Sequence, residues 1–97
     1  MKIYKKISEI ELTDYLNLVE DSNPLHYGIE AVLPGNFLLF ILEKMYHENY
    51  HEQLKYIKTT FLSPAYSNKN LEFTFNQTNF QIKDRNQKVI LKGEWKN

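Results

Sequence analysis

A carboxylate, an amide and an imidazole lie close together in the sequence, at Asp21, Asn23 and His26. Pro24 stiffens the loop between them, because its ring fixes the backbone angle φ. Asp21 and His26 follow the end of a predicted helix, so both side chains can turn to the same side and act on one water molecule or one proton. Asn23 could orient either of them. This composition is typical of a general acid–base site.

The same loop has a purely structural interpretation. Asp21 and Asn23 can form an Asx-type stop at the end of the helix, which leaves His26 as an ordinary loop histidine. Loops often carry function, whereas Asp-x-Asn-Pro also makes a good turn. The residues by themselves leave both interpretations open.

A second motif, His47-Glu48-Asn49-Tyr50-His51, has the pattern His-Glu-x-x-His. On a helix this spacing presents two imidazoles on one face as zinc ligands, with the glutamate as the general base of a metallopeptidase. Here the charged Glu52 follows directly, and no histidine remains downstream as a third ligand, so a carboxylate such as Glu72 would have to serve. We therefore expect a solvated helix end and no metal site, and rank the zinc peptidase as the weakest candidate function.

Two elements should position the acid–base loop from its N-terminal side. Residues 3–7 alternate in hydrophobicity with period two, which predicts a short strand. Ser8 and Glu11 resemble a capping box at the start of a helix. The helix should run to about Glu20, because apolar residues recur at i, i+3, i+4 and i+7, in Leu12, Tyr15, Leu16 and Val19.

On its C-terminal side the loop leads into Pro34-Gly35-Asn36, which opens the apolar run Phe37 to Leu42. A proline-led start and the continuation through Met45 and Tyr46 favour a helix over a buried strand. Six consecutive apolar residues cover every side of a helix, so we expect the rest of the domain to wrap around it.

The remaining chain predicts strands. Segments 56–62, 71–75 and 89–95 carry strand-like patterns, and hydrophobicity alternates with period two in the last two segments. In the segment 89–95 this alternation would place Ile90 on the same face as Lys88, Lys92 and Glu94. Residues 68–70 and 84–86 are turn-formers between antiparallel neighbours. The order predicts one α+β domain over residues 1–97, whose antiparallel sheet curls around one helix.

Composition excludes several classes of function. The 97 residues carry 12 Lys and Arg against 12 Asp and Glu, and this zero net charge argues against a nucleic-acid partner. The absence of cysteine excludes disulfides and thiolate metal sites, which favours a cytoplasmic setting. No signal-peptide pattern follows Met1, and the run 37–42 is far below the roughly 20 apolar residues of a membrane span. The aromatic residues should form the core, and self-association would help to cover them.

The string Asp21-Ser22-Asn23-Pro24-Leu25-His26 resembles the signature of the MaoC-like dehydratase family, hot-dog-fold enzymes that include the (R)-specific enoyl-CoA hydratases. In that family an Asp-x-Asn-Pro-Ile/Leu-His string follows a helix and precedes a glycine-led hydrophobic helix, as predicted here. Phe61-Leu62-Ser63-Pro64 looks like the family's Phe-x-x-Pro strand end. The resemblance implies a hot-dog fold, an antiparallel sheet wrapped around a buried central helix.

The resemblance also implies roles for individual residues. Asp21 and His26 would bind the hydrating water and move protons to and from the carbons α and β to a thioester carbonyl, while Asn23 holds them in register. The backbone N–H of Gly35 would polarise that carbonyl, a role that a helix N-terminus suits by its unpaired N–H groups. The implied protein is a homodimeric enoyl-thioester hydratase or 3-hydroxyacyl-thioester dehydratase, acting without cofactor on acyl-CoA or acyl-carrier-protein substrates in fatty-acyl metabolism.

Three features depart from the family pattern. Glu20 replaces the usual small glycine, Gly28 stands where an aspartate commonly follows the histidine, and the link from Ala31 to Pro34 is short. These differences keep open an alternative from another class. The chain could be a non-catalytic acyl-thioester-binding or assembly subunit with the same fold.

Overall fold

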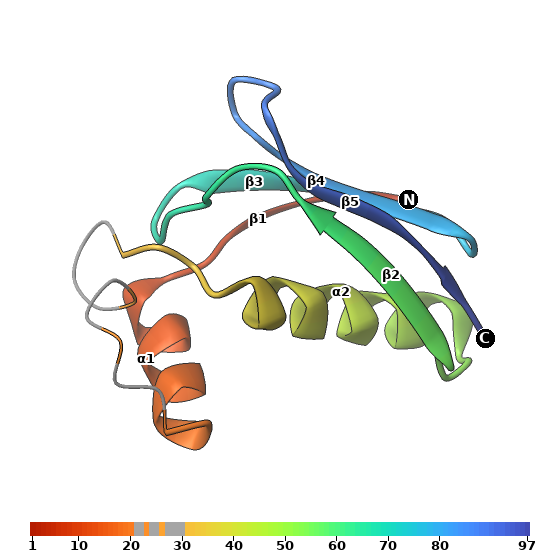
Figure 1. Ribbon diagram of the computed structural model, residues 1–97, viewed down its shortest axis with the longest axis horizontal. Coiled ribbons are helices and arrows are strands. Elements are labelled where there is room, and N and C mark those ends of the chain that lie inside the picture. Colours follow the sequence, from red (N-terminus) through yellow and green to blue (C-terminus); the bar gives the residue numbers. More distant parts are fainter. Residues whose placement is uncertain (21–22, 24–25, 27–30) are drawn as a thin grey trace.

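The computed structural model describes residues 1–20, 23, 26 and 31–97. This part of the chain forms one five-stranded sheet and two helices, of which the longer one runs along the sheet (Figure 1). The α+β class predicted from the sequence is therefore confirmed. The elements, in chain order, are β1 (Lys2–Lys6), α1 (Glu9–Leu18), α2 (Gly35–Tyr50), β2 (Tyr56–Phe61), β3 (Asn70–Phe75), β4 (Asn79–Asp84) and β5 (Val89–Lys96).

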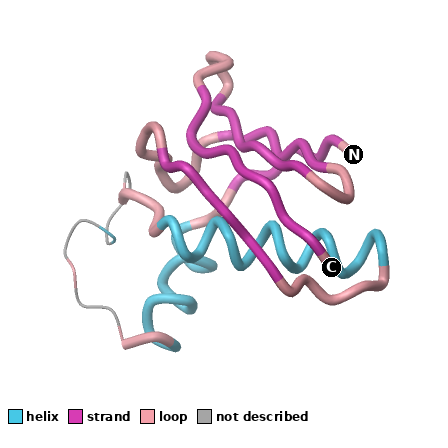
Figure 2. The backbone as a smooth tube through the Cα atoms, turned by 45° about the vertical axis from the view of Figure 1, so that its right-hand side comes forward, coloured by secondary structure: helices cyan, strands magenta, loops and turns pink. Residues whose placement is uncertain are grey.

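The sheet is antiparallel throughout and has the strand order β1-β3-β4-β5-β2. It curves over α2, which runs along one of its faces, while no described helix covers the opposite face (Figures 1 and 2). The strands β1 and β2 form the two edges. This is the expected arrangement of an antiparallel sheet curled around a central helix.

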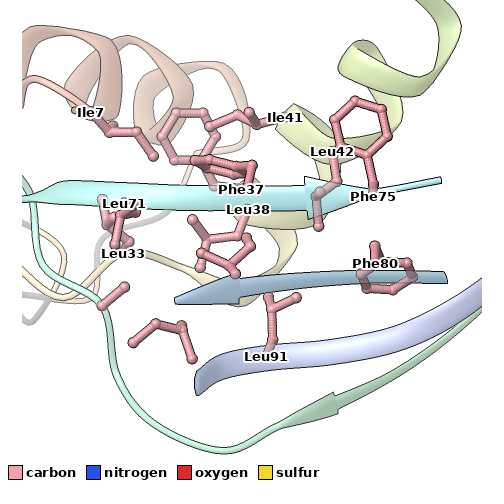
Figure 3. Close-up of a cluster of buried hydrophobic side chains, with 14 of the residues drawn as sticks. Ile7, Leu33, Phe37, Leu38, Ile41, Leu42, Leu71, Phe75, Phe80 and Leu91 are labelled. Atoms are coloured by element: carbon pink, nitrogen blue, oxygen red, sulfur yellow. The ribbon is translucent and has the colours of Figure 1, made fainter. Parts of the chain in front are cut away.

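The core lies between α2 and the inner face of the sheet (Figure 3). Trp95 on β5 is its largest fully buried side chain, and its ring centroid lies 4.9 Å from that of Tyr46 and 4.6 Å from that of Phe80. The indole Nε1 donates to the Asn76 carbonyl at 2.8 Å, which satisfies its polar edge. Burial raises the pKa of the Tyr46 hydroxyl. The prediction that the strand aromatics form the core is confirmed for Phe73, Phe75, Phe80 and Trp95. It is wrong for Tyr56 and Phe61 on the edge strand β2, which are 45% and 53% exposed.

One expectation about α2 is wrong. We expected the domain to wrap this helix on every side, yet Phe40 is 55% exposed. The sheet and α1 cover only part of the helix circumference, and a run of six apolar residues must place some of them on the remaining part. None of the helices in the described ranges combines the length and apolar character needed to cross a membrane.

The helix α1 begins as predicted and ends earlier. The Ser8 hydroxyl accepts the backbone N–H of Glu11 at 3.1 Å, which is the expected N-cap bond. The helix stops at Leu18, and Glu20 has the left-handed φ of 56°. Val19 therefore lies outside the helix and is 48% exposed, whereas Leu12 and Leu16 are buried as predicted.

A β-bulge overturns one strand prediction. Ile82 of β4 lies opposite Leu91, but the next residue, Lys83, lies opposite Val89, so Ile90 has no direct partner on β4. The period-two alternation of hydrophobicity predicts that Ile90 lies on the polar face of the strand with Lys92. In the structure Ile90 is 2% exposed, because the extra residue of a bulge breaks the alternation of faces.

Candidate functional site

The acid–base residues predicted from the sequence fall partly outside the described part of the chain. Asp21 and Gly28 lie outside the described residues. Asn23, His26 and Gly35 lie inside them, and the structure places the last two in one pocket. The geometry of the site is therefore built from His26, Gly35 and their neighbours.

Within the described part of the chain, His26 is held by hydrogen bonds from its backbone and from its ring. Its backbone N–H donates to the Asn23 carbonyl at 3.0 Å, and its Nδ1 atom lies 2.6 Å from the Val32 carbonyl oxygen. A carbonyl oxygen can only accept, so Nδ1 must carry the proton of this bond. In the neutral imidazole the lone pair is then on Nε2. This tautomer suits a histidine that takes a proton through Nε2.

The acceptor of that bond belongs to a segment anchored to the body of the domain. Val32 forms an isolated antiparallel bridge with Tyr66. On either side of it the Leu33 N–H donates to the Ala65 carbonyl at 2.8 Å, and the Ser67 N–H donates to the Ala31 carbonyl at 2.9 Å. The histidine ring is therefore oriented by backbone that is itself paired.

Gly35 is the first residue of α2, and Pro34 is its N-cap. The Pro34 carbonyl accepts the N–H groups of Phe37 and Leu38 at 3.1 and 3.2 Å. The N–H groups of Gly35 and Asn36 precede the first helical hydrogen bonds, and the helix dipole gives this end a partial positive charge. Such a helix start can stabilise an oxygen on which negative charge develops.

The ring of Phe61, at the end of β2, packs directly against Gly35. A Cβ atom built on Gly35 would lie 2.4 Å from Phe61 Cε1. A side chain at position 35 would therefore require the ring to move. Packing gives a reason for glycine at this position that is independent of any chemistry.

His26 and Gly35 meet in a surface pocket of about 560 Å³. Its lining is completed by Tyr15, Val19, Pro34 and Asn36. The pocket thus presents an imidazole and the start of a helix to one volume, which is the combination needed for proton transfer beside a polarised carbonyl. Asn23 is exposed, and its carbonyl oxygen rather than its side chain accepts the His26 N–H.

Tyr15 and Asn36 are pocket residues that the sequence analysis did not assign to the site. Tyr15 was placed on the apolar face of its helix, and its ring does stack on Phe37 with centroids 4.4 Å apart. The phenol hydroxyl of Tyr15 could have indicated a pocket residue, because a tyrosine on an apolar helix face combines a buried ring with a polar end. Asn36 was a polar residue in the first turn of an otherwise apolar helix.

The two histidines of the His-Glu-x-x-His motif lie at the C-terminal end of α2. α2 ends at Tyr50, and His51 is its C-cap, with the left-handed φ of 56°. The His51 N–H still donates to the His47 carbonyl at 2.9 Å, so His51 closes the last turn of the helix. No group of three or more His, Cys, Asp or Glu in the described ranges could hold a metal ion. This geometry does not support a zinc peptidase.

Comparison with known proteins gives structural likenesses only. No family model and no curated protein matches the sequence. Among solved structures, the (R)-hydratase from A. caviae involved in PHA biosynthesis superposes with a TM-score of 0.81 at 14% identity, covering 98% of this chain and 89% of that one. The C-terminally truncated 3R-hydroxyacyl-ACP dehydratase complex from Mycobacterium tuberculosis gives 0.72 at 9% identity, covering 98% and 92%.

A third protein of similar structure is named for a different role. A monoamine oxidase regulatory protein from Archaeoglobus superposes with a TM-score of 0.76 at 15% identity, covering 98% of this chain and 85% of that one. At such identities these structures share the fold with this chain. They confirm the hot-dog fold expected from the sequence, with hydratases, a dehydratase and a regulatory protein among its structural neighbours.

Proposed function

We propose that this chain is a single-domain member of the MaoC-like dehydratase family and acts as an enoyl-thioester hydratase or 3-hydroxyacyl-thioester dehydratase. The observation that carries the proposal is the meeting of His26 and Gly35 in one pocket, on elements that hold them in place. The acid–base string around His26 and the hydratases among the structural neighbours support it. The substrate would be an acyl-CoA or acyl-carrier-protein thioester, and the setting cytoplasmic.

In the direction of hydration, the water oxygen bonds to carbon β of the enoyl thioester while Asp21 or His26 takes a proton from that water. The electrons of the carbon–carbon double bond move toward the thioester oxygen, where the N–H of Gly35 would stabilise the developing charge. A proton from the same pair then adds to carbon α. Asn23 would keep Asp21 and His26 in register. The product contains all the atoms of the substrate and of the water, and no electrons are gained or lost, so the reaction needs no redox cofactor.

The lone pair on Nε2 fits this role of His26. Nδ1 is occupied by its bond to the Val32 carbonyl, so proton exchange with the substrate water would go through Nε2. The bond also fixes the ring, since Val32 lies in the anchored segment. A ring held in one orientation loses less entropy when the reacting groups align.

The acting form would be a homodimer. β2 is an edge strand, and its end residues Tyr56 and Phe61 are 45% and 53% exposed. An edge strand presents unpaired backbone groups that can join the sheet of a second copy. Since Phe61 lies against Gly35, a copy joined along β2 would come close to the proposed oxyanion site.

An assay with crotonyl-CoA and longer enoyl-CoA thioesters tests the proposal through loss of the conjugated thioester absorbance. We expect turnover by the purified protein and its loss in His26→Ala. His47→Ala serves as the matched control, because it removes an exposed histidine from the far end of α2. Equal activity of the two variants would contradict the proposed site.

A non-catalytic acyl-thioester-binding subunit is the second candidate. It is favoured by the absence of an acid at position 28 and by the packing of Phe61 on Gly35, which explains that glycine without catalysis. Calorimetry with a saturated acyl-CoA separates the two candidates. Binding without turnover of any enoyl thioester would establish the binding subunit.

A further inference from the structure

The face of the sheet that points away from α2 can be traced from the strand register. Residues directly opposite one another in antiparallel strands point to the same face. Lys2 lies opposite Thr74, Thr74 opposite Gln81, Gln81 opposite Lys92, and Lys92 opposite Thr60. This row crosses all the strands, and its members are exposed or half-buried. We call the surface that it marks the outer sheet face.

The neighbouring rows give this face a net positive charge. In the register of the described strands it carries six lysines against two glutamates, a net charge of +4. The charged residues are Lys2, Lys6, Lys58, Lys83, Lys92 and Lys96, with Glu72 and Glu94. Glu72 accepts from Lys2 Nζ at 3.1 Å and from the Tyr4 hydroxyl at 3.4 Å, and it raises the pKa of Lys2.

The opposite charge lies on the helices. α1 carries Glu9, Glu11 and Asp14 without a basic residue, and α2 carries Glu43 and Glu48 against Lys44. The two helices together hold a net charge of −4, while the whole sequence is neutral. The protein is therefore polarised, with a basic outer sheet face and acidic helices on the other side.

The centre of the outer sheet face is hollowed. A depression of about 620 Å³ is lined by Lys58 and Lys92, by the carboxylate of Glu94, and by the polar side chains of Thr60, Gln81 and Asn79. The lysines lie beside hydroxyl and amide groups that can exchange hydrogen bonds with a partner. Attraction between opposite charges speeds the encounter of two proteins and orients it.

We propose that the outer sheet face docks an acidic protein surface, one with an excess of carboxylates that matches its four positive charges. Nucleic acid fits less well. The sole arginine, Arg85, lies in the turn after β4, and the exposed Tyr4 and Tyr56 stand on opposite edge strands, too far apart to stack successive bases. The inference rests on the charge distribution and does not depend on the proposed hydratase activity.

The test compares two triple variants that remove the same charge. Lys58→Gln with Lys83→Gln and Lys92→Gln lowers the net charge of the outer sheet face from +4 to +1. Lys44→Gln with Lys55→Gln and Lys69→Gln removes three lysines elsewhere. The probe is fluorescein-labelled poly-L-glutamate of about 20 residues, followed by anisotropy at about 20 mM salt, where screening is weak. We expect the face variant to bind about tenfold more weakly and the control variant less than about twofold more weakly. Matching melting curves confirm that both variants are folded.

Three results would overturn the proposal. Equal weakening in both variants would mean that only net charge matters. Tighter binding of a labelled oligothymidylate of equal charge would assign the face to nucleic acid. The unchanged protein could also self-associate at low salt, seen as an increase in particle mass that is absent in the face variant. That result would identify the occupant as the acidic helices of a second copy.

Discussion

The Nδ1 atom of His26 lies 2.6 Å from the carbonyl oxygen of Val32. This bond fixes the protonated nitrogen and, because the flanking residues of Val32 pair with Ala65 and Ser67, ties His26 to the body of the domain. It therefore has both a structural and a chemical consequence, and substitutions can separate them.

The first prediction uses asparagine as a partial mimic of His26. The amide nitrogen of His26→Asn can take the place of Nδ1 and donate to Val32, but no lone pair replaces Nε2. We expect this variant to keep its melting temperature and to lose at least about 10²-fold in kcat, since general acid–base groups contribute about 10²–10⁴-fold. His26→Ala should lose the same activity and also about 1 kcal/mol of stability, the typical net value of a hydrogen bond. Full turnover in His26→Asn would exclude Nε2 from the chemistry.

The second prediction concerns Asp21, which the sequence pairs with His26. Asp21→Asn keeps the shape of the side chain and removes a proton acceptor, so kcat should fall by about 10²–10⁴-fold. Because two groups that act on one water form a unit, the double variant with His26→Ala should be little worse than the poorer single one. If Asp21 only caps the helix end, its replacement would instead cost roughly 1 kcal/mol of stability with turnover per folded molecule unchanged. Melting curves and turnover on the same preparations decide between these outcomes.

The third prediction tests the contact between Gly35 and Phe61. Gly35→Ala places a methyl group where the phenyl ring now packs, and we expect a loss of about 1 kcal/mol, because overpacking costs typically 1–3 kcal/mol and this ring is half-exposed. Phe61→Ala should restore the stability of the Gly35→Ala variant, which urea denaturation of the four proteins of the cycle measures. Additive effects would show that the two residues do not interact.

The fourth prediction is the homodimer. The exposed edge strand β2 and the exposed Phe40 on α2 leave apolar surface that a second copy can cover. Light scattering at about micromolar concentration should give twice the mass of the chain, in the range where specific interfaces persist. A monomer under these conditions would contradict the proposed assembly.

The fifth prediction is that His47→Ala and His51→Ala leave folding and activity nearly unchanged. Both histidines are exposed at the end of α2, and surface substitutions typically change stability by less than about 0.5 kcal/mol. Thermal unfolding and the enoyl-thioester assay check this expectation. Stoichiometric zinc in the purified protein, lost on either substitution, would revive the peptidase interpretation.

Local patterns in the sequence were sufficient for most of the fold. The cap at Ser8, the proline-led start of α2 and the period-two strands β3 and β5 depend on residues a few positions apart, so local patterns predict them. These features are local because capping, turn formation and side-chain alternation act within one element. The strand β4 (Asn79–Asp84) was not among the predicted strands. The hot-dog fold was implied by the resemblance of residues 21–26 to the MaoC-like signature.

Register and packing between distant segments decided the rest. Ile90 is buried because a bulge shifts β5 against β4. Phe40 is 55% exposed although its ring centroid lies 6.3 Å from that of Tyr15 on α1. The contact of Phe61 with Gly35 joins residues far apart in the sequence. A composition with equal numbers of acids and bases also concealed a basic sheet face and acidic helices. Such properties follow from which strand lies beside which, and the periodicity of one segment carries no information about its distant neighbours.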